Sequence, residues 1–564
     1  MPRTNHPSKR LIAAIAIIGL SSLALIAHWQ QTKNRSYSIL DSTRLIPKTA
    51  IAAAFIVPNP TALNYLEDFS TPEARTWFNQ TLIPLKQQAL AGTSLSYDRD
   101  LKPWMGGVLV AILPGSNPTT PNLIMVIGIK DKLRAWNFAR RLNQQPDLNR
   151  QVSQYQGIKI TQYQESDHKQ YHVAVLQDHL LIAASRQAIE QAIESTQSQT
   201  SLATVEGISE QFLGSVAVPN PLITAYIANY PQFMDVITKA TEKSPEKSTE
   251  KPSQPTLQIL TQLQSLQSLI LGIGIDSAGF RLKLVTHLAP RNAPESSPQI
   301  PLQANQGSQP AVGRLLDRLP TETIALVDLQ GIDQIWSYLT TSPPHSPLEN
   351  LAGQVRQALK TINLDADQDV FGWMDGELAL GAVASEEGVL APLGLGGVLV
   401  LETSDRTQAE DTLDKLDRVI GESSPPVNVE QRTLRGVEVT EWKDPRQGTL
   451  FGHGWLDEDL MFIAFGGPVV EAMTMIPEPP LQENPEFQAI SQALPYPNQG
   501  YLYLDVEDLL SWATGYLLAS PAIALQPNVL SLLNSVQGVG LSTTLPEPDR
   551  AEIEMFLSLK EQKQ

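Results

Sequence analysis

The amino-acid sequence predicts an α+β protein: a single N-terminal transmembrane helix followed by two homologous domains with mostly antiparallel sheets and packed helices. Three observations predict this fold class. The chain opens with one long apolar run, the rest of it contains the same series of motifs twice, and the strand-like segments are joined by Gly and Pro turns. With 564 residues, the chain is also too long for one hydrophobic core.

The first 29 residues have the pattern of a membrane anchor. Residues 11–29, LIAAIAIIGLSSLALIAHW, contain no Asp, Glu, Lys or Arg, and a helix of this length extends about 28 Å, enough to cross a bilayer's hydrocarbon core. Three basic residues lie within residues 1–10, so we expect that segment in the cytoplasm and a signal-anchor helix at 11–29. A signal peptide cleaved near Ala24 is the alternative, although its apolar core normally has only about 7–15 residues.

The repeated series is clearest at DRDLKPWMGG, which begins at Asp98, and DQDVFGWMDG, which begins at Asp367. Aligning Trp104 with Trp373 brings further segments together in the same order when small gaps are allowed. IPKTAIAAAFI matches LPTETIALVDL, NLIMVIGIKDKLRAWNFARRL matches GGVLVLETSDRTQAEDTLDKL, and YQGIKITQYQ matches LRGVEVTEWK. These pairs predict a strand after Pro, a strand followed by an Asp-initiated helix, and a strand after a Gly turn. The shared order predicts an internal duplication.

The duplication sets the predicted domain boundaries. The first α+β repeat is expected at residues 44–288 and the second at residues 314–560. Residues 289–312 between them are rich in Pro, Ser, Gln and Asn, which is typical of a linker. Residues 241–255, TEKSPEKSTEKPSQP, offer no apolar side chain to bury, so they are expected to form a disordered insertion in the first repeat.

Charge is distributed unevenly along the chain, and cysteine is absent. Residues 1–312 hold 27 Lys/Arg and 21 Asp/Glu, whereas residues 313–564 hold 14 and 38. The acidic second repeat would repel nucleic acid and attract a basic protein partner, so we expect a protein partner there and no nucleic-acid partner. Without cysteine, disulfides, thiolate metal sites and cysteine nucleophiles are excluded.

The doubled Asp motif is the strongest candidate for a cation site. Asp365, Asp367 and Asp369 form DADQD, which is similar to the start of a calcium-binding loop. The sixth and twelfth positions of that loop, where Gly and Glu are needed, hold Val370 and Gly376. We therefore interpret the Asp residues as a polar helix exit, with Trp104 and Trp373 holding the two turns in the core. Cation binding by the second copy stays an alternative.

Other chemical signatures are missing from the sequence. Glycines 394, 396 and 397 lead into a strand rather than a helix, which is the wrong context for a dinucleotide loop, and no P-loop occurs. The glycines of GIG (272–274) and GVG (538–540) are expected to mark bulges or close backbone packing. No Gly-x-Ser-x-Gly elbow is present, and the histidines, including His168 and His172, are expected to be surface residues. The sequence thus indicates no catalytic, cofactor-binding or metal-ligating residues and no cofactor.

Several of these motifs together resemble a known family. IPKTAIAAAFI with STPEARTWFNQ behind it, and WMGGVLVAI with WMDGELALGAV, are similar to a cyanobacterial family of membrane-anchored proteins known only as a domain of unknown function. The resemblance covers nearly the whole region after residue 29. It implies a cyanobacterial source, with the bulk of a single-pass membrane protein in the periplasm or the thylakoid lumen. The family implies no activity or site residues.

Three hypotheses of function follow. The first is a membrane-anchored, non-enzymatic interaction or scaffold protein with a partner on the acidic second repeat. The second is an extracytoplasmic ligand-binding protein with a cleft between the repeats, lined by aromatic residues such as Trp136, Trp336 or Trp442. The third is a carboxylate-based hydrolase, which would require a group of buried Asp and Glu side chains in one pocket.

Overall fold

The computed structural model divides the chain into two compact units. Unit 1 is Met1–His287 with Glu561–Gln564, and unit 2 is Leu288–Lys560. The residues that the structure describes are 39–57, 59, 61–62, 64–65, 97–117, 120–142, 149–164, 170–205, 208, 214, 216–242, 266–288, 315–340, 347–386, 388, 390–422, 427–495, 498, 500–517, 533–547 and 550–560.

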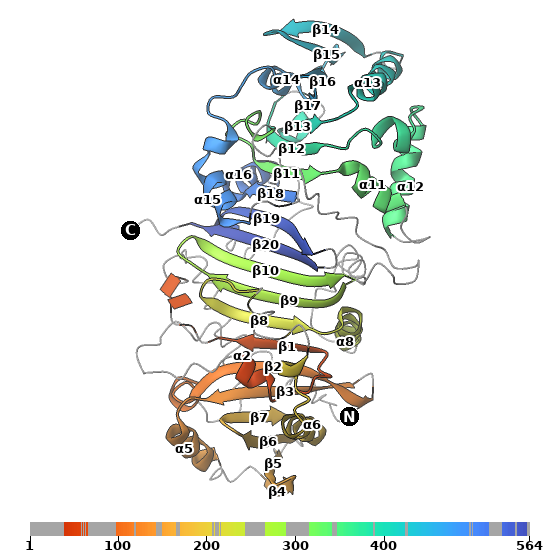
Figure 1. Ribbon diagram of the computed structural model, residues 1–564. Coiled ribbons are helices and arrows are strands. Elements are labelled where there is room, and N and C mark those ends of the chain that lie inside the picture. The colour runs from red at the N-terminus through yellow and green to blue at the C-terminus, as the bar shows by residue number, and fades with distance from the viewer. Residues whose placement is uncertain are drawn as a thin grey trace, which may run out of the picture. The chain divides into compact units, whose positions relative to one another are not determined.

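Unit 1 is built on ten strands (Figure 1). Neighbouring strands follow the order β4, β5, β6, β7, β3, β2, β1, β8, β9, β10, and the pairings with a defined register are antiparallel. The strands are β1 Ala52–Ile56, β2 Met105–Asn117, β3 Thr120–Ile129, β4 Asn149–Tyr155, β5 Ile158–Gln164, β6 Gln170–Leu176, β7 His179–Ala183, β8 Pro221–Ile227, β9 Leu266–Ile275 and β10 Gly279–Leu288.

Unit 2 contains a second set of ten strands in the same arrangement. Its order is β14, β15, β16, β17, β13, β12, β11, β18, β19, β20, again antiparallel. The strands are β11 Ala325–Gln330, β12 Glu377–Ala384, β13 Leu395–Glu402, β14 Asn428–Leu434, β15 Val437–Asp444, β16 Gly448–Trp455, β17 Leu460–Phe465, β18 Gly500–Asp505, β19 Val536–Glu547 and β20 Arg550–Leu559. We call two residues equivalent when they occupy the same place in the strand order and register of the two units.

Helices connect and cover these strands. In unit 1 they are α2 Ile39–Thr43, the π-helical turn η2 Tyr97–Leu101, α5 Lys132–Leu142, α6 Arg186–Gln197, η3 Leu202–Thr204 and α8 Tyr230–Glu242. In unit 2 they are α11 Ile332–Thr340, α12 Pro347–Lys360, the π-helical turn η5 Ala366–Val370, η6 Ala391–Leu393, α13 Arg406–Gly421, α14 Gly467–Met473, η7 Leu481–Glu483, α15 Pro485–Ala493 and α16 Val506–Leu517.

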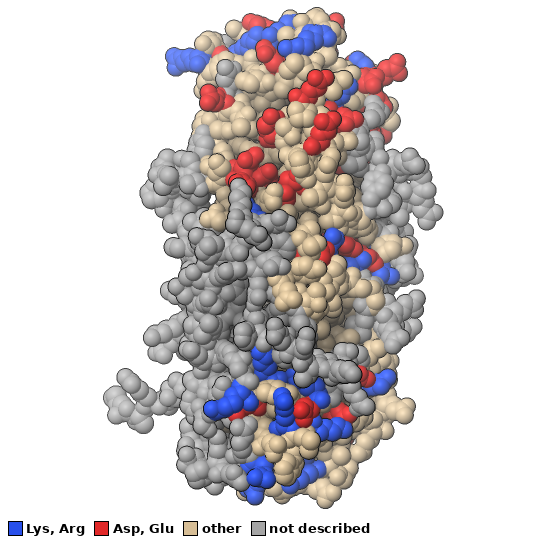
Figure 2. Space-filling model, turned by 90° about the vertical axis from the view of Figure 1, so that its left-hand side faces the viewer, with Lys and Arg blue, Asp and Glu red and all other residues tan. Residues whose placement is uncertain are grey.

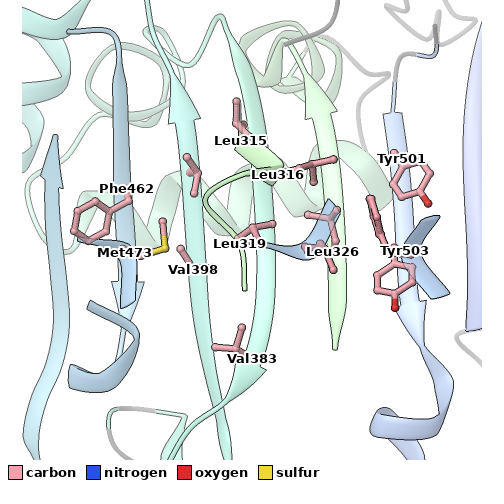
Figure 3. Close-up of a cluster of buried hydrophobic side chains, with 14 of the residues drawn as sticks. Leu315, Leu316, Leu319, Leu326, Val383, Val398, Phe462, Met473, Tyr501 and Tyr503 are labelled. Carbon is pink, nitrogen blue, oxygen red and sulfur yellow. The ribbon is translucent and has the colours of Figure 1, made fainter. Parts of the chain in front are cut away.

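Both faces of the sheet in unit 2 are covered, which explains the unbroken apolar run of β13. Val398 and Val400 join the buried cluster beneath α14 and α15, whereas Leu401 joins the cluster beneath α13. Successive strand residues point to opposite faces, so a strand that is buried on both sides must be apolar throughout. Figure 3 shows the first cluster, in which Leu319 and Leu326 lie among the strand side chains.

Each unit contains the same local hydrogen bond before its first strand. The backbone N–H of Leu202 donates to the carbonyl of Ile46 at 2.6 Å, and the N–H of Leu481 donates to the carbonyl of Leu319 at 2.8 Å. These bonds join the segment before the first strand of each unit to the short 3₁₀ helix η3 or η7. The start of IPKTAIAAAFI in unit 1 and the start of LPTETIALVDL in unit 2 are therefore held in the same way.

Glycines of the two closing strands allow close packing, as the sequence predicts. A Cβ at Gly272 would lie 2.3 Å from the carbonyl oxygen of Val216, and one at Gly540 would lie 2.2 Å from Cγ2 of Ile490. No larger residue fits at these distances without moving its neighbour. The interpretation of these glycines as positions of close packing is confirmed.

A buried tryptophan follows each π-helical turn and hydrogen-bonds back into it. The Nε1–H of Trp104 donates to the carbonyl of Asp100 at 2.7 Å, and the Nε1–H of Trp373 donates to the carbonyl of Asp369 at 2.8 Å. The two side chains are 2% and 3% exposed. The indole thus fills the core and satisfies a carbonyl of the turn, so the predicted role of both tryptophans as core anchors is confirmed.

The predicted fold class is wrong. Strand makes up 43% of the structure and helix 32%, so a large antiparallel sheet dominates the structure. Helices lie beside the strands in both units, but the strands contribute the larger share of the structure. No helix among the described residues is long and apolar enough to cross a membrane, so the predicted single N-terminal transmembrane helix is not supported, and its segment, residues 11–29, lies outside the described residues.

Other predicted segments fall partly or wholly outside the described residues. These are the N-terminal residues 1–10 and the linker 289–312. Of the predicted insertion 241–255, only Thr241 and Glu242 are described, and they form the end of α8 rather than disordered chain.

We expect Trp104→Phe and Trp373→Phe each to lower the free energy of unfolding by roughly 1–2 kcal/mol. Each change keeps an aromatic ring but leaves a buried carbonyl without its donor. Urea unfolding followed by circular dichroism measures the loss. Trp136→Phe is the control, because Trp136 is 59% exposed and a surface change should alter stability by about 0.5 kcal/mol or less. An equal effect of all three changes would contradict the anchoring role.

Candidate functional site

The three Asp side chains of DADQD in unit 2 each have partners within the chain. Oδ1 of Asp365 accepts from the backbone N–H groups of Asp367 and Gln368 at 2.9 and 3.0 Å, as an N-cap of η5. Oδ1 of Asp369 accepts from Nζ of Lys415 at 2.7 Å, and its Oδ2 accepts from the N–H of Asp365 at 2.8 Å. Two of the three predicted ligands therefore organise the turn itself.

Asp367 is held by a different pair of side chains. Its Oδ1 accepts from Nε1 of Trp336 at 2.6 Å and from Nη2 of Arg356 at 2.8 Å. The bond to Arg356 is the main reason that the pKa of Asp367 is lowered, and the bond to Lys415 is the main reason for the lowered pKa of Asp369. Both carboxylates are thus neutralised by cations of the chain.

The geometry therefore gives no support to a calcium loop. Among the described residues, no three His, Asp or Glu side chains lie where they could hold one metal ion. In unit 1 the equivalent of Asp369 is Asp100, which is 2% exposed and pairs with Arg99 at 3.0 Å. Both copies of the motif use an acid and a base to stabilise the turn.

A pair of buried carboxyl groups in unit 2 was not anticipated from the sequence. Asp328 on β11 is 4% exposed and Glu377 on the adjacent β12 is 5% exposed. Burial raises the pKa of Asp328 to about 7, and a hydrogen bond with Glu377 opposes part of this rise. Near neutral pH the pair therefore holds a proton that an exposed carboxyl group would have lost.

Unit 1 has no such pair at the equivalent positions. The equivalent of Asp328 is Phe55. Phe55 lies directly opposite Leu109 on β2, and Asp328 lies directly opposite Ala379 on β12. Two residues before Leu109 is Gly107, where a Cβ would lie 2.4 Å from the Phe55 ring. A phenylalanine packed on a glycine in one copy thus corresponds to two acids in the other.

Two further buried polar groups lie beside the acid pair on β18 and β19. Tyr501 is directly opposite Asp328, and Ser542 is directly opposite Tyr501. Both residues are buried, at 7% and 0% exposure, and burial raises the pKa of Tyr501. The sequence signal was available: the apolar strand AAAFIV in the first copy corresponds to ALVDLQ, with Asp in the middle, in the second.

The acid pair has suitable chemistry for proton transfer but little access. A carboxyl group with a pKa near 7 suits a general acid or base. A substrate must reach that group within hydrogen-bond distance, and Asp328 and Glu377 are almost fully covered. The hydrolase hypothesis thus has a buried acid pair but no exposed carboxylate at that position.

The histidine prediction is wrong for three residues. His172, His179 and His453 are 7%, 3% and 7% exposed, so they are core residues. Burial lowers the pKa of His172 and His179. Their alternating positions in apolar strands hide this burial in the sequence. His168 lies outside the described residues.

His453 belongs to a group that attaches α13 to the sheet. Its Nε2 lies 3.0 Å from Oδ1 of Asp417 on α13, and Nε1 of Trp442 on β15 donates to the same oxygen at 2.6 Å. The Trp442 ring also stacks on Phe451, with centroids 4.2 Å apart. A single carboxylate thus joins one helix to two strands.

The aromatic residues predicted to line a ligand cleft have separate environments. Trp442 is engaged as described above, and Trp336 is 6% exposed and stacks on Phe371 with centroids 4.1 Å apart. Trp136 alone of the three is open to solvent, on α5. Two of the proposed ligand contacts therefore serve packing within unit 2.

The helices α5 and α13 are equivalent but carry opposite charge. Each is preceded by an Asp cap, because Asp131 accepts from the N–H of Arg134 at 2.9 Å and Asp405 accepts from the N–H of Gln408 at 3.0 Å. Counting from these caps, Trp136 corresponds to Glu410, Asn137 to Asp411 and Arg140 to Asp414. Figure 2 shows Lys and Arg gathered on the face of unit 1 that carries α5.

Exposed acids lie on α13 and on the turns beside it. The side chain of Arg406 at the start of α13 reaches the carbonyls of Asp457 and Glu458 at 3.4 and 3.3 Å, so the β16–β17 turn lies beside the helix. The η5 turn lies on its other side, where Gln408 reaches the carbonyl of Gln368. The exposed carboxylates of this acidic surface belong to Asp365, Asp375, Asp405, Glu410, Asp411, Asp414, Asp457, Glu458 and Asp459.

The sequence matches the model of one protein family. The model of the family "Protein of unknown function (DUF3352)" matches residues 10–559. The chain belongs to the DUF3352 family. This supports the resemblance to a domain of unknown function, and no match among curated proteins is found.

Solved structures add only a weak likeness to this DUF3352 protein. "Structure of crystal form III of TP0453" has a TM-score of 0.26 and 10% identity, covering 44% of this chain and 80% of that one. "Structure of crystal form IV of TP0453" has a TM-score of 0.25 and 10% identity, covering 44% and 81%. Likeness at this level carries no argument about fold or function.

We expect Asp328→Asn to stabilise the DUF3352 protein at pH 8 by roughly 1–3 kcal/mol. Because the folded pKa of Asp328 is raised to about 7, the folded chain keeps a proton that the unfolded chain releases above about pH 4. The free energy of unfolding therefore falls as pH rises from about 4 to 7, and the change to Asn removes this loss. Urea unfolding at pH 4, 6 and 8 measures it.

The exposed Asp411, changed to Asn, provides the control for the stability of Asp328→Asn. Its carboxylate is already solvated, so stability should change little at any of the three pH values. An advantage of Asp328→Asn that is the same at pH 4 and pH 8 would contradict the raised pKa.

We also expect calcium to leave the fluorescence of Trp373 unchanged. Arg356 and Lys415 already neutralise Asp367 and Asp369, so a divalent cation would have to displace two ion pairs. Calcium titration of the wild type and of Trp373→Phe isolates the signal of this residue. A saturable change that disappears in Asp365→Asn would restore the cation hypothesis.

Proposed function

We propose that this protein is a non-enzymatic interaction protein that binds a basic protein partner through the acidic surface of unit 2. The observation that carries this proposal is the opposite charge of α5 and α13. Equivalent helices with the same Asp cap and the same place beside the sheet differ at their exposed positions, where Trp136, Asn137 and Arg140 correspond to Glu410, Asp411 and Asp414. A charge difference at exposed positions points to what the surfaces contact rather than to the fold.

Two cations of α13 pair with acids of unit 2, and the other exposed acids of the surface outnumber the cations beside them. Arg406 pairs with Glu410 at 2.7 Å and covers the ring of Trp455 at 4.2 Å. Lys415 pairs with Asp369 at 2.7 Å. Clustered charge of one sign accelerates association with a partner of opposite sign and weakens with salt.

We infer that the two units arose by duplication and later diverged at this surface. Matching strand order, matching Asp caps and matching Trp–carbonyl bonds support a common origin. Because of the common origin, the charges on α13 can be compared directly with those on the equivalent helix α5. The cyanobacterial source and extracytoplasmic location stay predictions from the family resemblance.

Neither alternative function has comparable support. A ligand-binding site would need exposed aromatic side chains, but Trp336 and Trp442 are used in packing. A carboxylate hydrolase would need access to Asp328 and Glu377, which are buried.

We expect the triple variant Glu410→Gln, Asp411→Asn, Asp414→Asn to lose its protein partner. Affinity capture with the full chain from extracts of the source cells, at low and at physiological salt, measures recovery. Removing three charges from one surface should reduce recovery roughly tenfold or more, because close charge pairs at interfaces contribute on the order of 1 kcal/mol or more each.

A second triple variant, Glu438→Gln, Glu478→Gln, Glu483→Gln, has the same net charge but changes exposed acids elsewhere on unit 2. It should recover the partner as the wild type does. Equal loss in both variants would show that only total charge matters and would count against a specific surface. Catalytic turnover of any substrate would refute the non-enzymatic part of the proposal.

A further inference from the structure

Unit 1 exposes large apolar side chains around α5. Leu133 and Trp136 on this helix are 76% and 59% exposed, and Val152 on β4 and Val175 on β6 are 55% and 56% exposed. Single exposed apolar residues are ordinary, but a group on one face indicates a contact surface. We call these four residues and the cations around them the α5 surface.

One side of α5 packs on the sheet, and its exposed apolar residues lie on the opposite side. Phe138 is buried against Trp104, with ring centroids 5.3 Å apart. At 100° per residue, Leu133, Trp136 and Arg140 fall on the side of the helix away from Phe138. The guanidinium of Arg140 lies 5.4 Å from the centre of the Trp136 ring, so cation and aromatic ring are presented together.

The strand residues lie on the same face of the sheet as α5. Val175 is directly opposite Leu180, which packs in the cluster formed by Trp104 and Phe138. Val152 is opposite Thr161, which is opposite Val173, and Val173 is opposite Ile182 of the same cluster. Residues directly opposite one another share a face, so the four apolar side chains belong to one side of unit 1.

Positive charge surrounds these apolar residues. Lys132, Arg134 and Arg140 on α5 are exposed, as are Arg150 on β4 and Lys159 on β5. Burial, with Lys102 and Arg134 nearby, lowers the pKa of Lys130 at the start of this helix to about 8. Two acids beside the helix pair with its cations, Asp178 with Lys132 at 2.6 Å and Asp131 with Arg134 at 3.3 Å.

Unit 2 differs at the position equivalent to Val175, so its exposure is not a property of the fold. Trp455, the equivalent of Val175, lies under the guanidinium of Arg406. In unit 2, Asp417 of α13 also binds Trp442.

We propose that the α5 surface binds peripherally to an anionic lipid bilayer. A helix with Trp and Leu on its outer side and Lys and Arg around them places the rings among lipid headgroups and the cations against lipid phosphates. The surface goes beyond the protein-binding function proposed for unit 2, and it lies on the other unit.

A lipid surface fits better than the acidic surface of a second copy. The α13 surface would neutralise the cations, but its outward positions are Thr407, Glu410 and Asp411, which offer nothing apolar to Leu133 and Trp136. The exposed large apolar residues of unit 2 lie outside α13, at Leu351, Leu380, Leu393, Met475 and Ile476. An anionic bilayer provides negative charge and apolar depth together.

The absence of cysteine makes a direct test available. A cysteine introduced as Asn137→Cys in the full chain, labelled with an environment-sensitive dye, reports on α5. The equivalent Asp411→Cys on α13 is the matched control, because both positions are exposed on equivalent helices. The dye reports only on its own surroundings, so vesicle contact through another segment leaves it unchanged.

We expect the dye at position 137 to shift to the blue with vesicles of equal parts phosphatidylcholine and phosphatidylglycerol, and less at high salt. The dye at position 411 should not respond. Adding Leu133→Glu and Trp136→Glu to the Asn137→Cys chain should weaken vesicle binding roughly tenfold or more. Both residues are exposed, so this variant should fold, as circular dichroism can check.

Three outcomes would overturn the proposal. The first is no shift at position 137 with anionic vesicles. The second is an equal shift with phosphatidylcholine alone, which would remove the role of negative charge. The third is a shift that grows with protein concentration in the absence of vesicles, which would assign the surface to a second copy of the chain.

Discussion

The hydrogen bond from a buried tryptophan to a carbonyl four residues earlier is the constraint on which each unit depends. Trp104 and Trp373 join a π-helical turn to the strand that follows it, and both indoles are nearly inaccessible to solvent. The strand that begins after the turn, β2 or β12, lies in the middle of the strand order and pairs on both sides. Its start therefore sets the register of its neighbours. A shift by one residue would exchange the two faces of the sheet.

With the sheet fixed in this way, the two units differ where the fold allows it. Both faces of β13 are buried, with Val398 and Val400 on one side and Leu401 on the other, and its residues there are apolar. The outer sides of α5 and α13 have no such requirement. Here one unit has an exposed tryptophan and arginine and the other has acids, while both helices start with an Asp cap. The charge difference between the halves of the sequence thus includes the outer sides of two equivalent helices.

The sequence predicted many strand and helix starts, but it did not predict contacts that depend on how the strands pair. Gly turns, Pro starts and Asp caps are local signals, so strands such as β5 and the start of α13 could be placed from the residues alone. Pairing of Asp328 with Glu377, and of Asp417 with His453, joins residues far apart in the chain, and no local pattern reports such contacts. For the same reason, the sequence did not show that Arg356 and Lys415 bind Asp367 and Asp369, which argues against cation binding by DADQD. Hydropathy identified an apolar segment at residues 11–29, but apolar length by itself does not show that a segment spans a membrane.

The buried acid pair is the point at which the second unit departs from the simplest stable packing. Unit 1 fills the equivalent space with Phe55 against Gly107, which buries apolar surface and leaves no polar group to satisfy. Unit 2 keeps Asp328 and Glu377 there, although a buried carboxyl group with a raised pKa costs stability at neutral pH. Tyr501 and Ser542, also buried, continue the polar row across β18 and β19. Because unit 1 shows that the fold does not require these acids, stability does not explain their presence in unit 2.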